Sequence, residues 1–290
     1  MPEPTCYLDH AATTPLRPEA RAAMLPWLGE GFGNPSGAHR VARAARQAVD
    51  EARDAVAAVV GCRPGEVVFT GGGTEADNLA VTGSLAARPG RALCSAVEHE
   101  AVLQPVRHAG GRTVPVDAAG VVDLDALAEL CTADTAVVSV MVANNEVGTL
   151  QPVAEVAEVV HRRAPRAVVH ADAVQAAAWL DLPGLLAGTD LVSLSSHKVG
   201  GPQGVGALAV RGGAAPRALA LGGGQERGLR SGTHNVAGIV GFAAALGATA
   251  AARVDTASQL RARRDRLGDA LAAAVPGLVE TGPARAGRLP

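Results

Sequence analysis

The feature that most limits the fold of this chain is a regular alternation of short apolar runs with longer helical patterns. Strands are predicted at the apolar runs Glu66–Thr70, Arg91–Ser95, Arg112–Val116, Thr135–Val142, Ala167–Ala171, Leu191–Leu194 and Val205–Val210. Such alternation is typical of an α/β fold with a mostly parallel sheet and helices on both faces. In sheets of this kind ligands bind outside the carboxyl ends of the strands. We therefore expect functional residues directly after strands.

Helical patterns fill the intervals between these runs. A first helix is predicted at Pro18–Leu28, and a long one follows Ser36 as its N-cap and ends at Gly61. Further helices are predicted at Thr74–Leu85, Glu100–Ala109, Leu124–Cys131, Val153–Arg163, Val236–Ala252 and Thr256–Ala274. The apolar segment Val236–Ala252 consists largely of Ala and Gly, which favours a buried helix over a membrane span.

Composition excludes several classes of function. The chain has 290 residues, a formal net charge of −2 and no basic run. This balance argues against a role at nucleic acids or membrane surfaces. The first ten residues have neither the basic nor the apolar part of a secretory signal, so a cytoplasmic location is expected.

The four cysteines, Cys6, Cys62, Cys94 and Cys131, lie far apart in the sequence. There is no CxxC motif and no cluster of histidines beside them. They predict neither a disulfide framework nor a metal site. Each is interpreted as a small buried hydrophobe rather than a nucleophile.

Lysine usage is the most informative count. The chain has 26 Lys and Arg together, and Lys198 is its single lysine. Arginine serves equally well for solubility and ion pairs, whereas forming an imine with an aldehyde requires a primary amine. Lys198 is therefore either a chance survivor of a strong composition bias or the attachment point of an aldehyde cofactor.

Polar or glycine-rich segments follow several of the predicted strands. Gly71 to Glu75 opens a helix, where glycines and free N–H groups suit an anion, although an ordinary tight turn has the same pattern. Asp172 ends a strand and could pair with a protonated pyridine nitrogen, or simply cap a helix. Gln175 could donate to a ring oxygen.

Three further segments fit the same interpretation. His99 follows a strand and could stack on a heteroaromatic ring or relay protons, or be an ordinary histidine. The amides of Asn144 and Asn145 could bond a cofactor hydroxyl or a substrate carboxylate, although Asn is also common in turns. Ser195 and His197 stand beside Lys198 and could hold a phosphate.

In this order the motifs resemble the class V aminotransferases among the fold-type I enzymes that use pyridoxal 5'-phosphate. They are most similar to the cysteine desulfurases of the nitrogen-fixation and housekeeping iron–sulfur branch. The matching stretches are Tyr7–Pro15, Gly33–Ser36 with His39, Phe69–Leu79, Val97–His99, Asn144–Gly148, His170–Gln175, Ser195–Lys198 and Gly222–Thr233.

The resemblance implies a role for each matching position. Lys198 would carry the cofactor as a Schiff base, and His99 would stack on its ring and assist proton transfer. The implied cofactor-binding residues are Gly73, Thr74, His99, Asn145, Asp172, Gln175, Ser195, His197, Lys198 and Thr233. Thr233 would reach the phosphate in a neighbouring subunit, which implies a homodimer.

The implied reaction converts L-cysteine to L-alanine and passes the sulfur to an acceptor or scaffold protein. The family's nucleophilic cysteine and substrate-binding arginine lie in a C-terminal part that we expect to be missing here. The implied organisation is an N-terminal segment 1–15, a cofactor-binding large domain 16–250 and the start of a truncated small domain 251–290. The alternatives are another class V enzyme, such as a lyase or epimerase, and an inactive fragment that binds the cofactor.

Overall fold

The computed structural model describes residues 6–290, so the first five residues of the predicted segment 1–15 lie outside the described residues. Its strands are β1 (Val67–Thr70), β2 (Arg91–Ser95), β3 (Arg112–Val114), β4 (Thr135–Met141), β5 (Val168–Asp172), β6 (Leu191–Ser195) and β7 (Gly206–Val210). They form one sheet in the order β1-β7-β6-β5-β4-β2-β3. β7 alone among them runs antiparallel to its neighbours β1 and β6. The prediction of a mostly parallel sheet is confirmed.

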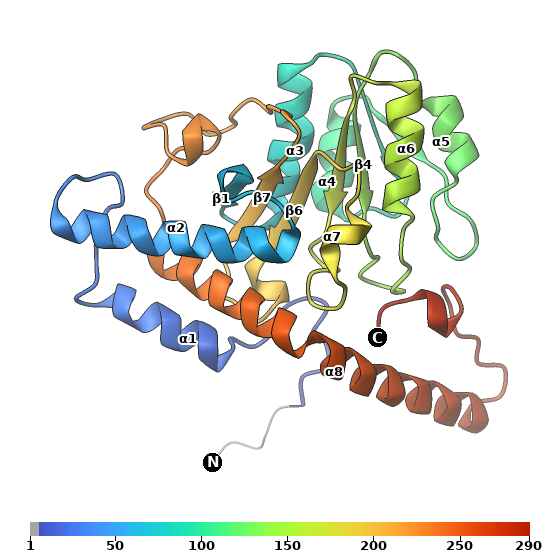
Figure 1. The fold of residues 1–290 in the computed structure, drawn as a ribbon. Helices are drawn as coiled ribbons and strands as arrows, with labels where there is room; N and C mark the ends of the chain where they lie inside the picture. Colours follow the sequence, from blue (N-terminus) through green and yellow to red (C-terminus); the bar gives the residue numbers. More distant parts are fainter. Residues whose placement is uncertain (1–5) are drawn as a thin grey trace.

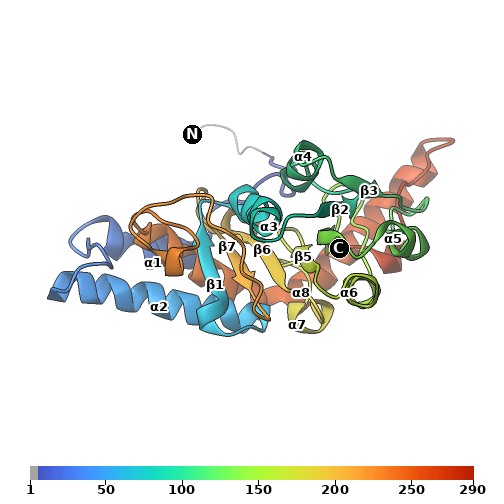
Figure 2. The same cartoon turned by 90° about the horizontal axis from the view of Figure 1, so that it is seen from above.

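The helices are α1 (Pro18–Met24), α2 (Arg40–Val60), α3 (Gly73–Ala87), α4 (Glu100–His108), α5 (Leu124–Leu130), α6 (Val153–Arg163), α7 (Leu182–Leu185) and α8 (Val236–Ala274). Short 3-10 turns lie at Leu25–Leu28, Pro64–Glu66, Ser196–Lys198, Glu226–Gly228 and Arg285–Gly287. Seen from above in Figure 2, α3 and α4 lie on one side of the sheet, and α2, α6 and α7 lie on the other. The prediction of helices on both faces is therefore also confirmed.

Strand alternation explains this layering. On β5, Val168 packs in the apolar cluster beneath α3, whereas Val169 packs in the cluster beneath α5 and α6. His170 and Asp172 follow Val168 at a spacing of two, so they point to the α3 face as well. The direction of the two side chains is thus set by the apolar residues of the same strand.

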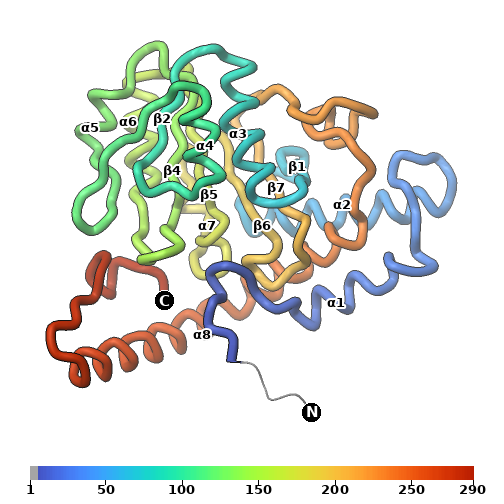
Figure 3. The backbone as a smooth tube through the Cα atoms, turned by 180° about the vertical axis from the view of Figure 1, so that it is seen from behind, coloured from blue at the N-terminus to red at the C-terminus, as the bar shows by residue number. Residues whose placement is uncertain are grey.

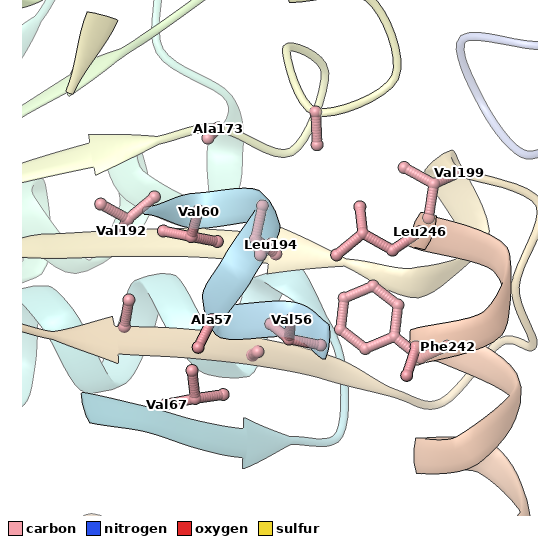
Figure 4. Packing of buried hydrophobic residues seen from close by; sticks show 14 of the residues in the cluster. Val56, Ala57, Val60, Val67, Ala173, Val192, Leu194, Val199, Phe242 and Leu246 are labelled. Carbon is pink, nitrogen blue, oxygen red and sulfur yellow. The ribbon is translucent and has the colours of Figure 1, made fainter. Parts of the chain in front are cut away.

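The largest core lies between the sheet and helices α2 and α8 (Figures 1 and 4). Val56 and Val60 of α2 meet Leu194 of β6, and Phe242 and Leu246 of α8 complete the cluster. Alanines at the remaining contact positions of α2 allow the two helices to approach closely. Burying a side chain of valine size or larger contributes about 1.5–3 kcal/mol.

The predicted start of the long helix is wrong. Ser36 lies in a turn, where its N–H donates to Oδ1 of Asn34 at 3.0 Å. The helix begins at Arg40, and the side chain of His39 accepts from the N–H of Ala42 as the N-cap. The predicted end is correct, because Gly61 stops the helix with a left-handed φ of 74°.

The two predicted C-terminal helices are a single helix of 39 residues, α8. Residues 253–255, where we expected a break, contain neither Gly nor Pro, so nothing in the backbone interrupts the helix. α8 is long and apolar enough to span a membrane, but half of its most apolar stretch is buried inside the protein. Its first part is a core helix, as Phe242 and Leu246 show.

The second part of α8 extends beyond the sheet, and the chain after it turns back (Figure 3). The N–H of Leu289 donates to the carbonyl of Gly148 at 2.9 Å, and Arg288 forms a bridge with Thr149. The predicted boundary between residues 250 and 251 falls inside the continuous helix. The division into a large and a small domain stays a prediction.

A buried ion pair fastens the glycine-rich loop before α8 to the sheet. The Glu226 carboxylate accepts from both terminal nitrogens of Arg53 at 2.7 Å, from the Phe69 N–H at 2.8 Å and lies 2.7 Å from Nε2 of His234. Glu226 and Arg227 have φ values of 48° and 59°, a strained conformation for residues with side chains. The carboxylate interactions hold the loop in this conformation.

Glu226→Gln should destabilise the protein by about 3–5 kcal/mol near neutral pH, because it leaves Arg53 buried without a counter-charge. Burial alone would raise the pKa of Glu226, but hydrogen bonds from Arg53 and His234 outweigh burial and lower that pKa to about 2. The wild-type advantage is therefore present above the ordinary glutamate pKa and is lost as pH falls toward 2. Thermal unfolding of both proteins from pH 7 to pH 3 measures it.

Asp134→Asn is the matched control, because the Asp134–Arg91 pair is exposed and should contribute little. Equal melting temperatures for wild type and Glu226→Gln at pH 7 would contradict the anchoring role.

Candidate functional site

A cavity of about 550 Å³ lies at the sheet edge where the parallel strands end. It is lined by Asp9, Ala11, Ala12, Gly73, Thr74, Asp77, His99, Ala101, Met141, Ala143, Asn145, Glu146, Asp172, Val174, Gln175, Ser195, His197 and Lys198. Nine of the ten predicted binding residues are in this set. They come from five separate chain segments, so the predicted convergence at the strand ends is what the structure shows.

The N-terminus of α3 forms one wall. Gly72 has a φ of 151°, which residues with side chains rarely adopt. A Cβ on Gly73 would lie 3.0 Å from Cγ2 of Val174 and 3.2 Å from Cβ of Ser195. The first N–H groups of a helix have no partner within the helix and carry its positive dipole end. With the Thr74 hydroxyl beside them, this wall suits a phosphate.

Lys198 ends the short 3-10 turn Ser196–Lys198 after β6, and its side chain is half-buried. Its Nζ donates to the carbonyl oxygens of Ala11 and Ala12, the second at 2.9 Å. Burial lowers the pKa of Lys198, and the negative charges of Asp172 and Asp9 oppose that shift. A larger neutral fraction makes the amine a better nucleophile.

Residues 9–14 cover the amine from the solvent side. The N–H and the hydroxyl of Thr14 both donate to the carbonyl of His197, at 3.1 and 2.7 Å. Nδ1 of His197 lies 3.1 Å from the hydroxyl of Thr13. Gln175 donates to the carbonyl of Ala11 at 2.8 Å. Three of the predicted residues thus contact this N-terminal segment.

Asp172, at the end of β5, is 6% exposed. One of its oxygens, Oδ1, accepts from the N–H of Val174 at 2.9 Å. Burial raises the pKa of Asp172, while that backbone hydrogen bond and electrostatic interactions with His99 and Lys198 lower it. A cationic ring nitrogen in the cavity would further stabilise the carboxylate form.

His99 caps α4, and its Nδ1 accepts from the N–H of Ala101 at 3.1 Å. This bond places the ring proton on Nε2 and leaves the ring on the cavity wall. Asn145 also lines the cavity, whereas Asn144 is buried and structural. The Oδ1 of Asn144 accepts from the N–H groups of Glu146 and Val147.

Thr233 is the predicted residue that the structure does not bring to this cavity. It is exposed on the loop that Glu226 anchors. Its predicted contact with a neighbouring subunit stays a prediction. Ser195, by contrast, is 3% exposed and lies against Gly73, as a phosphate-binding residue would.

A second cavity of about 970 Å³ opens beside the first and shares Ala11, Asn145, Glu146, Gln175 and Lys198 with it. Its other walls come mainly from the second part of α8 and residues 278–290. The reactive amine thus stands between a small polar chamber and a larger, more apolar one.

Sequence reasoning missed several residues of the polar chamber. Asp77 lies one helical turn after Gly73, and that i, i+4 spacing was the available signal for it. Asp9, Ala11 and Ala12 were noticed only as part of a motif, and their position over the amine depends on tertiary contacts. Glu98 lies outside the cavity lining; it is 5% exposed, and burial raises its pKa to about 8.

None of the four cysteines lines either cavity among the described residues. Cys94 and Cys131 are buried in apolar clusters, and burial raises the pKa of Cys94 to about 12. Such thiols are unreactive packing residues. Cys6 is exposed and Cys62 is half-buried.

This geometry has a specific chemical capacity. A partly neutral primary amine, a buried carboxylate and an anion-binding helix end face one chamber. The amine suits attack on an aldehyde, and the carboxylate suits a cationic heterocycle. The described residues contain no group of His, Cys, Asp and Glu that could hold a metal ion.

Comparison with known proteins agrees with the site. Residues 6–288 match the family model described as aminotransferase class-V. The chain is 41% identical to "Cysteine desulfurase IscS 1" of Archaeoglobus fulgidus, over 91% of this chain and 70% of that relative. It thus spans about seven tenths of the length of this relative.

Solved structures give the same result. A structure described as "NIFS-LIKE PROTEIN" is 38% identical with a TM-score of 0.88, over 91% of this chain and 75% of that one. Another, "SspA in complex with cysteine", is 36% identical with a TM-score of 0.78, over 83% and 72%. On the extent of the family match, the chain belongs to the class V aminotransferase family, as its motifs predicted.

Proposed function

We propose that this protein is a cysteine desulfurase that depends on pyridoxal 5'-phosphate, converting L-cysteine to L-alanine with transfer of the sulfur. The observation that carries the proposal is the meeting of the single lysine, Lys198, with Asp172 in one chamber at the carboxyl edge of the sheet. The desulfurase names of its relatives support the substrate. A solved neighbour is described in complex with cysteine.

The chamber fits the cofactor at each of its polar groups. The α3 N-terminus with Gly73, Thr74, Ser195 and His197 would hold the phosphate. Any side chain at residue 73 would crowd Val174 and Ser195, so only glycine leaves this wall open to the anion. At the other end, the free oxygen of Asp172 would accept from the ring nitrogen, and Gln175 would reach the ring hydroxyl.

When bound, pyridoxal phosphate supplies an aldehyde that joins amines covalently and a ring that withdraws electrons from the carbon losing its proton. Lys198 would attach it and, once displaced by the substrate amine, accept and return the α-proton at Nζ. The lowered pKa of Lys198 favours the neutral amine that both tasks need. His99 would lie against the ring and present the Nε2 proton.

The residues around the amine would also control water. The carbonyl oxygens of Ala11 and Ala12 accept hydrogen bonds from the Lys198 amine, and the chain from Asp9 to Thr14 covers that amine. Substrate entering from the larger cavity would meet Asn145 and Gln175 beside the amine. The sulfur acceptor would be a thiolate other than the buried Cys94 and Cys131.

A homodimer and a cytoplasmic location belong to the same proposal. Thr233 is exposed and lies outside the cavity lining, which supports a contact with a second copy rather than with its own site. All four cysteines are free, which supports a reducing compartment. A sulfur-acceptor or scaffold protein would be the remaining partner.

Lys198→Ala and Lys198→Arg should both abolish the visible absorbance of the bound cofactor after dialysis and the release of alanine from L-cysteine. Arginine keeps the charge and cannot form the covalent bond, so the pair separates the two properties. In wild type, borohydride reduction should add the cofactor mass to the peptide containing residue 198. Cofactor mass on the N-terminal amine instead would refute the assignment.

Asp172→Asn should weaken cofactor binding about 10- to 100-fold, because hydrogen bonds to charged groups contribute about 1.5–3 kcal/mol. It should also slow exchange of the α-proton of L-alanine with deuterated solvent, followed by proton NMR. Asp9→Asn is the matched control. The charge of Asp9, like that of Asp172, raises the pKa of Lys198, but Asp9 lies in residues 9–14, which cover the amine. An exchange rate equal to that of wild type in Asp172→Asn would remove the proposed role.

A further inference from the structure

A row of buried polar side chains crosses three adjacent strands beneath the cavity. His170 stands in the middle of the row, on β5, and is 0% exposed. Its Nδ1 lies 2.7 Å from the hydroxyl of Ser139 on β4, and its Nε2 lies 2.9 Å from the hydroxyl of Ser193 on β6. Neither hydroxyl is a counter-charge, and burial lowers the pKa of His170 to about 3. The imidazole is therefore neutral.

Asp77 of α3 faces this row from above and also lines the cavity. It is 2% exposed, and its Oδ1 is buried without a hydrogen-bond partner among the described residues. The nearest basic atom, Nε2 of His170, lies 3.6 Å away, beyond hydrogen-bond distance. A neutral histidine at that distance does not balance a negative charge. An ionised Asp77 would thus be a buried carboxylate without a counter-charge.

The surrounding charges make ionisation of Asp77 still less favourable. Two other carboxyl groups face it, Asp172 at the end of β5 and Glu98 after β2. Lys198 supplies the positive charge on this side, and it acts on Asp172. Burial, followed by the charge of Asp172, raises the pKa of Asp77 well above its ordinary value, and these effects outweigh the smaller opposing interaction with the Ser193 hydroxyl. Two close buried carboxyls do not both ionise without a counter-charge.

We propose that Asp77 is a positioning residue that stays protonated in the folded protein and, with His170, Ser139 and Ser193, keeps the negative charge of this polar layer on Asp172. The role toward the cofactor rests on the proposed function, whereas the protonation of Asp77 is a property of the chain alone. A neutral Asp77 leaves one carboxylate to match one ring nitrogen. A second charge there would bind the ring proton more tightly.

The stability of the cofactor-free protein tests the protonation, because the two possible states give opposite signs. A raised pKa costs wild type stability as pH rises from the ordinary aspartate value toward the folded value. Asp77→Asn avoids this cost. Its melting temperature, relative to that of wild type, should therefore increase as pH rises from 4 to 7. Glu98 is present in both proteins, and the variant Glu98→Gln measures its own contribution separately.

Two variants calibrate the sign of this difference. The melting temperature of Glu98→Gln, relative to that of wild type, should also increase as pH rises, because the pKa of Glu98 is raised to about 8. Glu226→Gln should behave oppositely, because the pKa of Glu226 is lowered to about 2. If Asp77→Asn follows Glu226→Gln, or shows no pH dependence, Asp77 is ionised and the proposal is wrong.

An infrared measurement on wild type tests the protonation of Asp77 even if Asp77→Asn does not fold. Protein labelled with ¹³C only in the aspartate carboxyls should show a protonated-carboxyl band at pH 7 that moves with the label, which separates it from Glu98. The band should persist in Asp172→Asn, because burial, the main cause of the shift, remains. Absence of such a band would overturn the proposal.

The loaded protein tests the consequence for the ring. Asp77→Asn, a neutral mimic, should retain the bound cofactor and keep the pH midpoint of its visible absorbance. Asp172→Asn should bind the cofactor about 10- to 100-fold more weakly than wild type. Loss of cofactor from Asp77→Asn as well would show that the charge of Asp77 is needed and would sink the inference. If wild type itself binds no cofactor, the proposed function fails, while the stability measurements still decide the protonation.

Discussion

The parallel direction of six strands is the constraint on which the site depends. Because β1 to β6 all point the same way, their carboxyl ends meet at one edge, and residues as far apart in sequence as Gly73 and Lys198 line one cavity. β7 is the exception, and its first residue, Gly206, packs against the backbone of Gly72. That close approach fixes the glycine turn at the start of α3.

Electrostatics inside the cavity follow from burial in the same layer. The strand period of two places His170 and Asp172 on the α3 face, and helix spacing places Asp77 opposite them. The amine of Lys198 and the carboxyl of Asp172 thereby acquire shifted pKa values in opposite directions, because burial disfavours the charged form of each. A chamber of this kind suits a cofactor that brings both an anion and a cation.

Sequence patterns predicted helix and strand boundaries correctly where the pattern had a single structural interpretation. Gly61 ends α2 because glycine accepts a positive φ, and the apolar runs of β2 and β4 had no competing helical period. They failed where two signals competed. Ser36 is a preferred N-cap residue, but the turn held by Asn34 keeps it outside the helix, and His39 caps the helix instead. Residues 253–255, between the two predicted helices, include no residue that stops a helix.

The sequence by itself determined the fold class and most of the residues around Lys198, because the alternation of strands and helices and the hydrophobic period are local properties that locate the strand ends. Only the tertiary structure decided which groups are buried together. The cover of Ala11 and Ala12 over the amine and the pairing of Glu226 with Arg53 join segments more than 150 residues apart. The protonation of Asp77 and Glu98 depends on such neighbours, since desolvation and nearby charge are set by the packed structure and not by sequence spacing.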